Sequence, residues 1–234
     1  MNTKEIRKIA RIAGILYLAV AFLAPLGDMV FRADLIVPGD VAATASNIMA
    51  YEWQYRLGFV SDLITQTVQV FLVLFLFKLL KPVNKNHAVL LAVLGLVSVP
   101  ITMLNELNQI VPLLLLNGAG TLTGFTTGQL QTLATLFLDL RVQGVSISYI
   151  FWGLWLFPMG YLIFKSGYIP KILGVLMIIA GLGYLIEFFL FFLFPQINAS
   201  IIMFTFWGEV ILPVWLLIKG VNVKQWEKHT LEST

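Results

Sequence analysis

The sequence predicts an all-α membrane protein in which six transmembrane helices form one bundle. Three observations support this class. The 234 residues are 59% hydrophobic and only 12% charged, with a mean hydropathy of +0.90, whereas soluble domains carry about 25% charged residues. Several apolar runs reach the roughly 20 residues that cross a bilayer as a helix. Positive charge gathers in short connectors on one side, as the positive-inside rule describes.

Six apolar runs are expected to be the spans of a single membrane domain, residues 1–234. The first run follows a basic segment, and the rival interpretation is a signal peptide cleaved near Ala19-Val-Ala21. An uncleaved span is preferred because the apolar run continues past that point. The expected spans are 12–31, 57–80, 88–116, 145–164, 172–194 and 201–218, followed by a polar cytoplasmic tail, 219–234.

Two connectors on the outer side are expected to hold short extra helices. In the first connector, Asp40 follows Pro38-Gly39 and can cap a helix over 41–50. Beyond that helix, Tyr51, Trp53 and Tyr55 suit the aromatic belt of a membrane interface. In the third connector, the helical pattern from 127 to 164 would be roughly 57 Å long if straight, which exceeds the membrane. The sequence therefore predicts a separate helix over 128–142 that breaks near Gly144.

The distribution of Lys and Arg predicts the orientation of the chain. With both termini and the turns 81–85 and 166–171 in the cytoplasm, only Arg32, Arg56 and Arg141 lie outside. The basic residues then inside are Lys4, Arg7, Lys8, Arg11, Lys78, Lys81, Lys85, Lys165, Lys171, Lys219, Lys224 and Lys228. This asymmetry favours cytoplasmic termini, which requires an even number of spans.

The third span carries a polar stretch between two prolines, Pro100 and Pro112. A charged side chain at mid-membrane costs at least about 2.5–3.5 kcal/mol on insertion scales, so Glu106 is expected to face the protein interior or water. The bundle's acids fall in the outer half or at the outer rim, which predicts an outward-facing acidic pocket. These acids are Asp28, Asp62, Glu106, Asp139, Glu187 and Glu209.

Candidate ligand-binding residues follow from this pocket. They are Asp62, Gln66, Asn105, Glu106, Gln109, Asp139, Arg141, Glu187 and Glu209. We expect Asp62, Glu106 and Glu209 to converge from three spans. The alternative is that these groups are structural: Asp28 would pair with Arg56 at the interface, and the buried amides would only join helices. No catalytic residue is assigned.

Several chemistries are excluded by the residues that are absent from the sequence. The chain has no Cys, so disulfides, Cys-ligated zinc, iron–sulfur clusters and a thiol nucleophile are ruled out. The two histidines, His87 and His229, fall in a loop and in the tail, which argues against an intramembrane metal site and a Ser-His-Asp triad. No phosphate-binding glycine loop is present. No cofactor, metal or nucleic-acid partner is expected.

Eight segments together resemble a known group of membrane proteins. They are Ala10-Arg-Ile-Ala-Gly14, Leu35-Ile-Val-Pro-Gly-Asp-Val-Ala-Ala-Thr-Ala45, Arg56-Leu-Gly-Phe-Val-Ser-Asp62, Lys81-Pro-Val-Asn-Lys85, Leu136-Phe-Leu-Asp-Leu140, Lys165-Ser-Gly-Tyr-Ile-Pro-Lys-Ile-Leu-Gly174, Ala180-Gly-Leu-Gly-Tyr-Leu-Ile186 and Leu217-Ile-Lys-Gly-Val-Asn222. In these segments the chain resembles the bacterial multi-pass membrane protein family catalogued as domain of unknown function 4386. The resemblance implies the plasma membrane of a bacterium and no particular activity.

The leading functional hypothesis is therefore drawn from the residues. It is binding or transport of a small polar or cationic ligand through the outward-facing acidic pocket. One alternative is a membrane enzyme that uses carboxylates on a lipid, and another is an accessory or structural membrane subunit. The lipid bilayer is the expected partner, and a homo-oligomer or a second membrane protein stays open.

Overall fold

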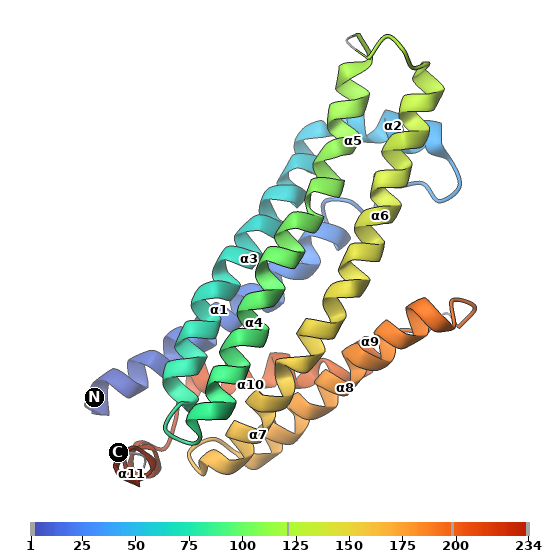
Figure 1. Cartoon of the computed structure of the whole chain (residues 1–234). Helices are drawn as coiled ribbons and strands as arrows, with labels where there is room; N and C mark the ends of the chain where they lie inside the picture. The colour runs from blue at the N-terminus through green and yellow to red at the C-terminus, as the bar shows by residue number, and fades with distance from the viewer. Residues whose placement is uncertain (1–2, 121, 198, 233–234) are drawn as a thin grey trace. The chain divides into compact units, whose positions relative to one another are not determined.

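The computed structural model describes residues 3–120, 122–197 and 199–232, and these residues form helices and connecting turns without a strand (Figure 1). The helices are α1 (Thr3–Met29), α2 (Val41–Ala50), α3 (Glu52–Leu80), α4 (Lys85–Asn105), α5 (Leu107–Asn117), the 3-10 turn η1 (Gly118–Gly120), α6 (Thr127–Leu154), α7 (Leu156–Ser166), α8 (Lys171–Leu193), α9 (Ile202–Thr205), α10 (Trp207–Ile218) and α11 (Val223–Glu232).

Five of the described helical segments are long and apolar enough to cross a membrane. They are Lys4–Met29, Glu52–Leu80, Lys85–Asn117, Thr127–Ser166 and Lys171–Leu193. A sixth is counted when Ile202–Ile218 and Val223–Leu231, which meet at a 98° bend, are taken as one broken span. The prediction of an all-α membrane protein is therefore confirmed.

The helix expected in the first connector is present and is capped as predicted. Asp40 lies just before α2, and its Oδ1 accepts a hydrogen bond of 2.8 Å from the backbone N–H of Ala43. This bond satisfies one of the amides that a helix start leaves without an intrahelical partner.

The predicted break near Gly144 is wrong. The chain is helical over 128–142, but α6 continues through Gly144 to Leu154, and the interruption falls at Trp155, before α7. Gly144 instead allows close approach, because a Cβ built on it would collide with the side-chain amide of Asn105. In the sequence alone, a glycine that allows helix contact cannot be distinguished from a glycine that ends a helix.

The third span is interrupted between its two prolines, which both lie inside helices. The interruption falls at Glu106, between α4 and α5. The Glu106 N–H is shared between the Thr102 and Met103 carbonyl oxygens, both at 3.2 Å. The Glu106 carbonyl oxygen accepts the N–H groups of Gln109 and Ile110, at 3.0 and 3.2 Å. The turn therefore combines α-helical with 3-10-type hydrogen bonds.

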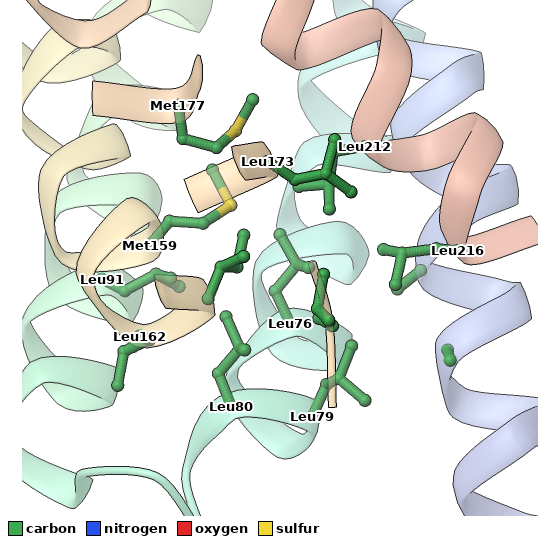
Figure 2. Packing of buried hydrophobic residues seen from close by; sticks show 14 of the residues in the cluster. Leu76, Leu79, Leu80, Leu91, Met159, Leu162, Leu173, Met177, Leu212 and Leu216 are labelled. Atoms are coloured by element: carbon green, nitrogen blue, oxygen red, sulfur yellow. The ribbon is translucent and has the colours of Figure 1, made fainter. Parts of the chain in front are cut away.

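The chain divides into two compact units. Unit 1 contains residues 1–21, 67–99 and 146–234, and unit 2 contains residues 22–66 and 100–145. The core of unit 1 includes leucine and methionine side chains of α3, α4, α7, α8 and α10, which Figure 2 shows packed together. Unit 2 has a smaller apolar cluster around Leu35, Ile48, Tyr55, Leu113 and Leu138.

Glycines bring α8 close to α6 and α7 within unit 1. A Cβ on Gly160 would lie 2.6 Å from the Gly174 carbonyl oxygen, and one on Gly181 would lie 2.9 Å from the Gly153 carbonyl oxygen. Small residues allow such backbone contact between membrane helices, where lipid gives little hydrophobic drive for association.

Candidate functional site

Unit 2 holds a buried group of charged and polar side chains, here called the arginine–carboxylate cluster. Its members are Asp28, Arg32, Asp62, Glu106, Gln109 and Arg141. They come from the end of α1 and the turn after it, from α3, from the break between α4 and α5 with the first turn of α5, and from α6. Residues far apart in the sequence therefore meet in one network.

Arg32 lies at one centre of this network. Its Nη1 donates to Asp62 Oδ2 and to Gln109 Oε1, both at 2.7 Å, and its Nε donates to Asp28 Oδ1 at 2.9 Å. The side chain is only 2% exposed. Burying a guanidinium in a membrane protein is tolerated because carboxylates and an amide oxygen surround it.

Arg141 is the second centre and shares the same acceptors. Its Nη1 lies 3.0 Å from Asp28 Oδ1, its Nη2 lies 3.2 Å from Asp62 Oδ2, and its Nε lies 3.0 Å from Gln109 Oε1. Each of these three oxygens therefore bridges both arginines. Shared acceptors couple the two side chains, so displacement of one alters the hydrogen bonds of the other.

Glu106 contributes the most buried carboxylate of the cluster. Its side chain is 2% exposed, and its Oε2 lies 3.5 Å from Arg141 Nε. This oxygen and Gln109 Nε2 have no hydrogen-bond partner among the residues that the structure describes. Among these residues, Arg32 Nη2 likewise has only an ion-pair contact, with Asp28 Oδ1 at 2.7 Å. The cluster therefore contains a poorly satisfied acceptor and unused donors, although buried polar groups are normally paired.

The helix break is held in place by two further contacts. The Tyr55 hydroxyl donates to the Gln109 carbonyl oxygen at 2.7 Å, and Tyr55 is fully buried. Asn105 Nδ2 donates to the Arg141 carbonyl oxygen at 2.9 Å. These bonds fix the start of α5 to α3 and the end of α4 to α6.

Two glycines give Arg32 its space. A Cβ on Gly27 would lie 2.8 Å from Arg32 Nη2 and would also collide with the Asp62 carboxylate. One on Gly58 would lie 3.0 Å from Arg32 Nη1. The guanidinium thus lies directly against the backbones of α1 and α3, where any larger residue would displace it.

The cluster has an exposed rim and an excess of negative charge. The Asp28 side chain is 57% exposed, whereas that of Asp62 is 10% exposed. Three carboxylates face two guanidinium groups, so one formal negative charge is left over when all are ionised. The arrangement can accept a donor-bearing cation and can also present guanidinium donors to an anion.

The predicted site residues divide into those in the cluster and those outside it. Four of them meet in the cluster: Asp62, Glu106, Gln109 and Arg141. Asn105 lies beside it and bonds the Arg141 backbone. Gln66 is buried one turn along α3 from Asp62. Asp139 is exposed on α6, outside the network. Arg56 pairs with Glu52, with 2.7 Å between Nε and Oε1. Asp28 pairs instead with the two arginines of the cluster. The alternative in which Asp28 pairs with Arg56 is therefore wrong.

The other two predicted acids belong to unit 1. Glu209 Oε2 accepts from the Tyr17 hydroxyl at 3.1 Å, and the Tyr184 hydroxyl bonds the same carboxyl group. Its second oxygen, Oε1, is buried without a partner among the described residues. Glu187 Oε2 instead accepts the N–H groups of Ile201 and Ile202, at 2.6 and 3.1 Å, where α9 begins.

Sequence reasoning missed Arg32 as a site residue. It follows the first apolar run and was assigned to a polar connector outside the membrane. The signal that could have found it is the spacing of Asp28 and Arg32, since residues four apart in a helical turn can form an ion pair. Tyr55 was missed for a similar reason, because its aromatic neighbours suggested the membrane interface.

Comparison with known proteins gives two matches. The sequence model of the family described as domain of unknown function (DUF4386) matches residues 12–220. An uncharacterized protein of Archaeoglobus fulgidus is 44% identical over 81 residues, which are 35% of this chain and 49% of that protein. The chain thus covers about half the length of this relative. No solved structure matches the chain.

Proposed function

This chain belongs to the DUF4386 family, and we propose that it binds or transports a small polar or cationic ligand at the arginine–carboxylate cluster. The observation that carries this proposal is the state of Glu106. Its carboxylate is almost fully buried, its Oε2 is unpaired by hydrogen bonds in the described part of the chain, and Gln109 Nε2 nearby is unpaired as well. An acceptor and a donor left unsatisfied in one buried group can together bind a ligand with complementary atoms.

The sign of the charge favours a ligand with a positive group. The cluster has one carboxylate more than it has guanidinium groups. A cationic ligand near Glu106 would balance this excess and supply the missing donor. The two arginines would then orient the ligand through its polar acceptors, since a guanidinium donates in a fixed planar geometry.

The exposure of Asp28 supports access of a ligand to the cluster from the surface of unit 2. The Asp28 side chain is 57% exposed, whereas the side chains of Asp62 and Glu106 are 10% and 2% exposed. Asp28 is therefore the rim of the cluster, and Glu106 is its most deeply buried acid.

We place both termini in the cytoplasm and the protein in the plasma membrane of a bacterium. The support is the concentration of basic residues in the N-terminal segment, the turns 81–85 and 166–171 and the tail, together with the resemblance stated above. In this topology the cluster opens to the outside of the cell.

The experiment is a ligand screen on the purified full chain in detergent. Alkali, alkaline-earth and organic cations and small zwitterionic metabolites are added singly, and the melting temperature is recorded. A true ligand stabilises by RT ln(1 + [L]/Kd), or about 2.7 kcal/mol at a hundredfold excess over Kd. Glu106→Gln should abolish the shift, whereas Asp139→Asn, which changes an exposed acid of α6, should preserve it.

A second candidate is a purely structural role for the cluster. The observation in its favour is that Asp28, Asp62 and Gln109 each bridge both arginines, which would hold α1, α3, α5 and α6 together without any ligand. No stabilising ligand in the screen, combined with a large loss of stability on removing Asp62, would favour this role over binding.

A further inference from the structure

A concave site lies within unit 1, and none of the residues predicted to bind a ligand lines it. It is a pocket of about 510 Å³ formed by the turn between α7 and α8 and by the turn between α10 and α11. That volume falls in the roughly 300–1,000 Å³ range of small-molecule sites. Its walls include Tyr168, Lys171, Trp215, Lys219 and Asn222.

The pocket lies at the level of a membrane surface. Three helices end or begin at its edge: α7 ends at Ser166, α8 begins at Lys171 and α10 ends at Ile218. The apolar spans Thr127–Ser166 and Lys171–Leu193 stop on either side of the turn 167–170, so this turn leaves the hydrocarbon. Phospholipid phosphates occupy this interfacial region.

The charge of the pocket is positive. Lys171 and Lys219 line it, and no carboxylate does. Neither lysine makes an ion pair with any residue that the structure describes; the described contact of Lys171 is with the Phe164 ring, 5.5 Å from Nζ to the centroid. Two ammonium groups without counter-ions at a bilayer surface attract anionic headgroups, each by a factor of about five in affinity.

The turn that forms the pocket is rigidly built. The Tyr168 and Trp226 side chains donate to the same carbonyl oxygen, that of Leu79, at 2.8 and 3.1 Å. The Asn222 N–H donates to the Tyr168 carbonyl oxygen at 3.0 Å and joins the two turns. The Tyr168 hydroxyl is a donor at neutral pH, as for any tyrosine, and burial raises its pKa further. The walls are therefore preorganised, which lowers the entropic cost of binding.

We infer that this pocket binds the phosphate headgroup of an anionic phospholipid between Lys171 and Lys219. The first turn of α8 adds to the attraction, because Pro170, the N-cap residue before the helix, provides no side-chain cap for the helix amides. Trp215, half-buried at the end of α10, lies where an aromatic ring can contact the glycerol region at the interface. The inference does not depend on the ligand proposed for the arginine–carboxylate cluster.

Native mass spectrometry of the delipidated full chain tests this site. Dioleoylphosphatidylglycerol and dioleoylphosphatidylcholine are titrated separately, and the apparent Kd of the first bound lipid is measured. We expect tighter binding of the anionic lipid. Replacing both lysines, Lys171→Gln with Lys219→Gln, should weaken it about 25-fold, since each contributes about fivefold. The matched control, Lys81→Gln with Lys85→Gln, removes the same charge from a basic turn that does not line the pocket, and it should weaken binding less than the pocket variant does.

A second variant keeps the inference testable if the double lysine variant does not fold. Asn222→Asp adds a carboxylate to the pocket wall, and Asp preserves the side-chain oxygen that accepts the Gln225 N–H at the start of α11. Asn222→Asp should weaken binding of the anionic lipid and leave the Kd of the zwitterionic lipid unchanged. Equal Kd values for the two lipids, or equal losses in both double variants, would overturn the inference. Inorganic phosphate that stabilises the chain as much as the lipid does would show a free-anion site instead, and the lipid assignment would fail.

Discussion

The side chain of Asn105 donates a hydrogen bond to the backbone carbonyl oxygen of Arg141, with 2.9 Å between the two atoms. This bond places the middle of α6 against the end of α4. The amide is itself fixed by Asn108, whose Nδ2 donates to Asn105 Oδ1 at 3.0 Å. The position of the Arg141 guanidinium therefore depends on the Asn105 side chain of α4. It also depends on Gly144, which leaves space for that side chain.

Gly144→Ala should destabilise the protein by about 1–3 kcal/mol, because the added methyl group meets Asn105 in a packed interface. The measurement is the free energy of unfolding in mixed micelles, from titration with a denaturing detergent. The double variant Gly144→Ala with Asn105→Ala should be less destabilised than the sum of the single variants, since the colliding group is gone.

Gly128→Ala is the matched control for that substitution. Gly128 also lies in α6, and a Cβ there would have nothing within 4 Å. Alanine at an open helical position should be neutral or stabilising by up to about 1 kcal/mol. Equal destabilisation at both glycines would contradict the close-approach role of Gly144.

Asp62→Asn should cost about 3–5 kcal/mol of stability, because two buried guanidinium groups lose the carboxylate that they share. The same unfolding titration measures it. The control is Glu52→Gln, which breaks the ion pair with Arg56, a side chain that is 45% exposed. A surface pair contributes at most about 1 kcal/mol, so similar losses in the two variants would argue against the buried network.

Glu187→Ala should lower stability by about 1–2 kcal/mol, because it removes the acceptor for two amides at the start of α9. Glu187→Gln retains an acceptor oxygen and should lose less. Neither variant should alter the affinity of a ligand found for the cluster. A changed Kd in Glu187→Gln would return this residue to the binding site.

The topology can be tested by single-cysteine labelling, since the chain has no native cysteine. Thr123→Cys lies in the exposed turn between α5 and α6, and Lys224→Cys lies on the exposed face of α11. In intact cells an impermeant maleimide should label the first and not the second. Labelling of the cysteine at 224 alone would reverse the proposed orientation.

Local patterns were sufficient for most of the fold. The apolar runs predicted an all-α protein with long apolar helices, because a bilayer fixes the length and polarity of a helix that crosses it. Asp40 predicted the start of α2, because a cap is a short-range hydrogen bond. The polarity of the stretch around Glu106 correctly indicated an interior position, and the structure buries Glu106 and Gln109 there. The convergence of Glu209 with these residues stays a prediction.

The remaining features depend on contacts between distant segments. Arg32 lies beyond the first apolar run, and only the packing of α1 against α3 at Gly27 and Gly58 gives it a buried place. A glycine such as Gly144 can either interrupt a helix or allow close contact with a neighbouring helix. The sequence of one helix does not distinguish these two roles, because the role depends on which side chain of the neighbouring helix lies against the glycine.

The shared carbonyl of Leu79 has a mechanical consequence. The helix α11 and the turn after α7 are hydrogen-bonded to the same atom at the end of α3, one through Trp226 and the other through Tyr168. An axial shift of that end must either carry both segments with it or break both hydrogen bonds at once. An axial movement of α3 would therefore move α11 as well. A measured displacement of α11 would report that movement of α3 within unit 1.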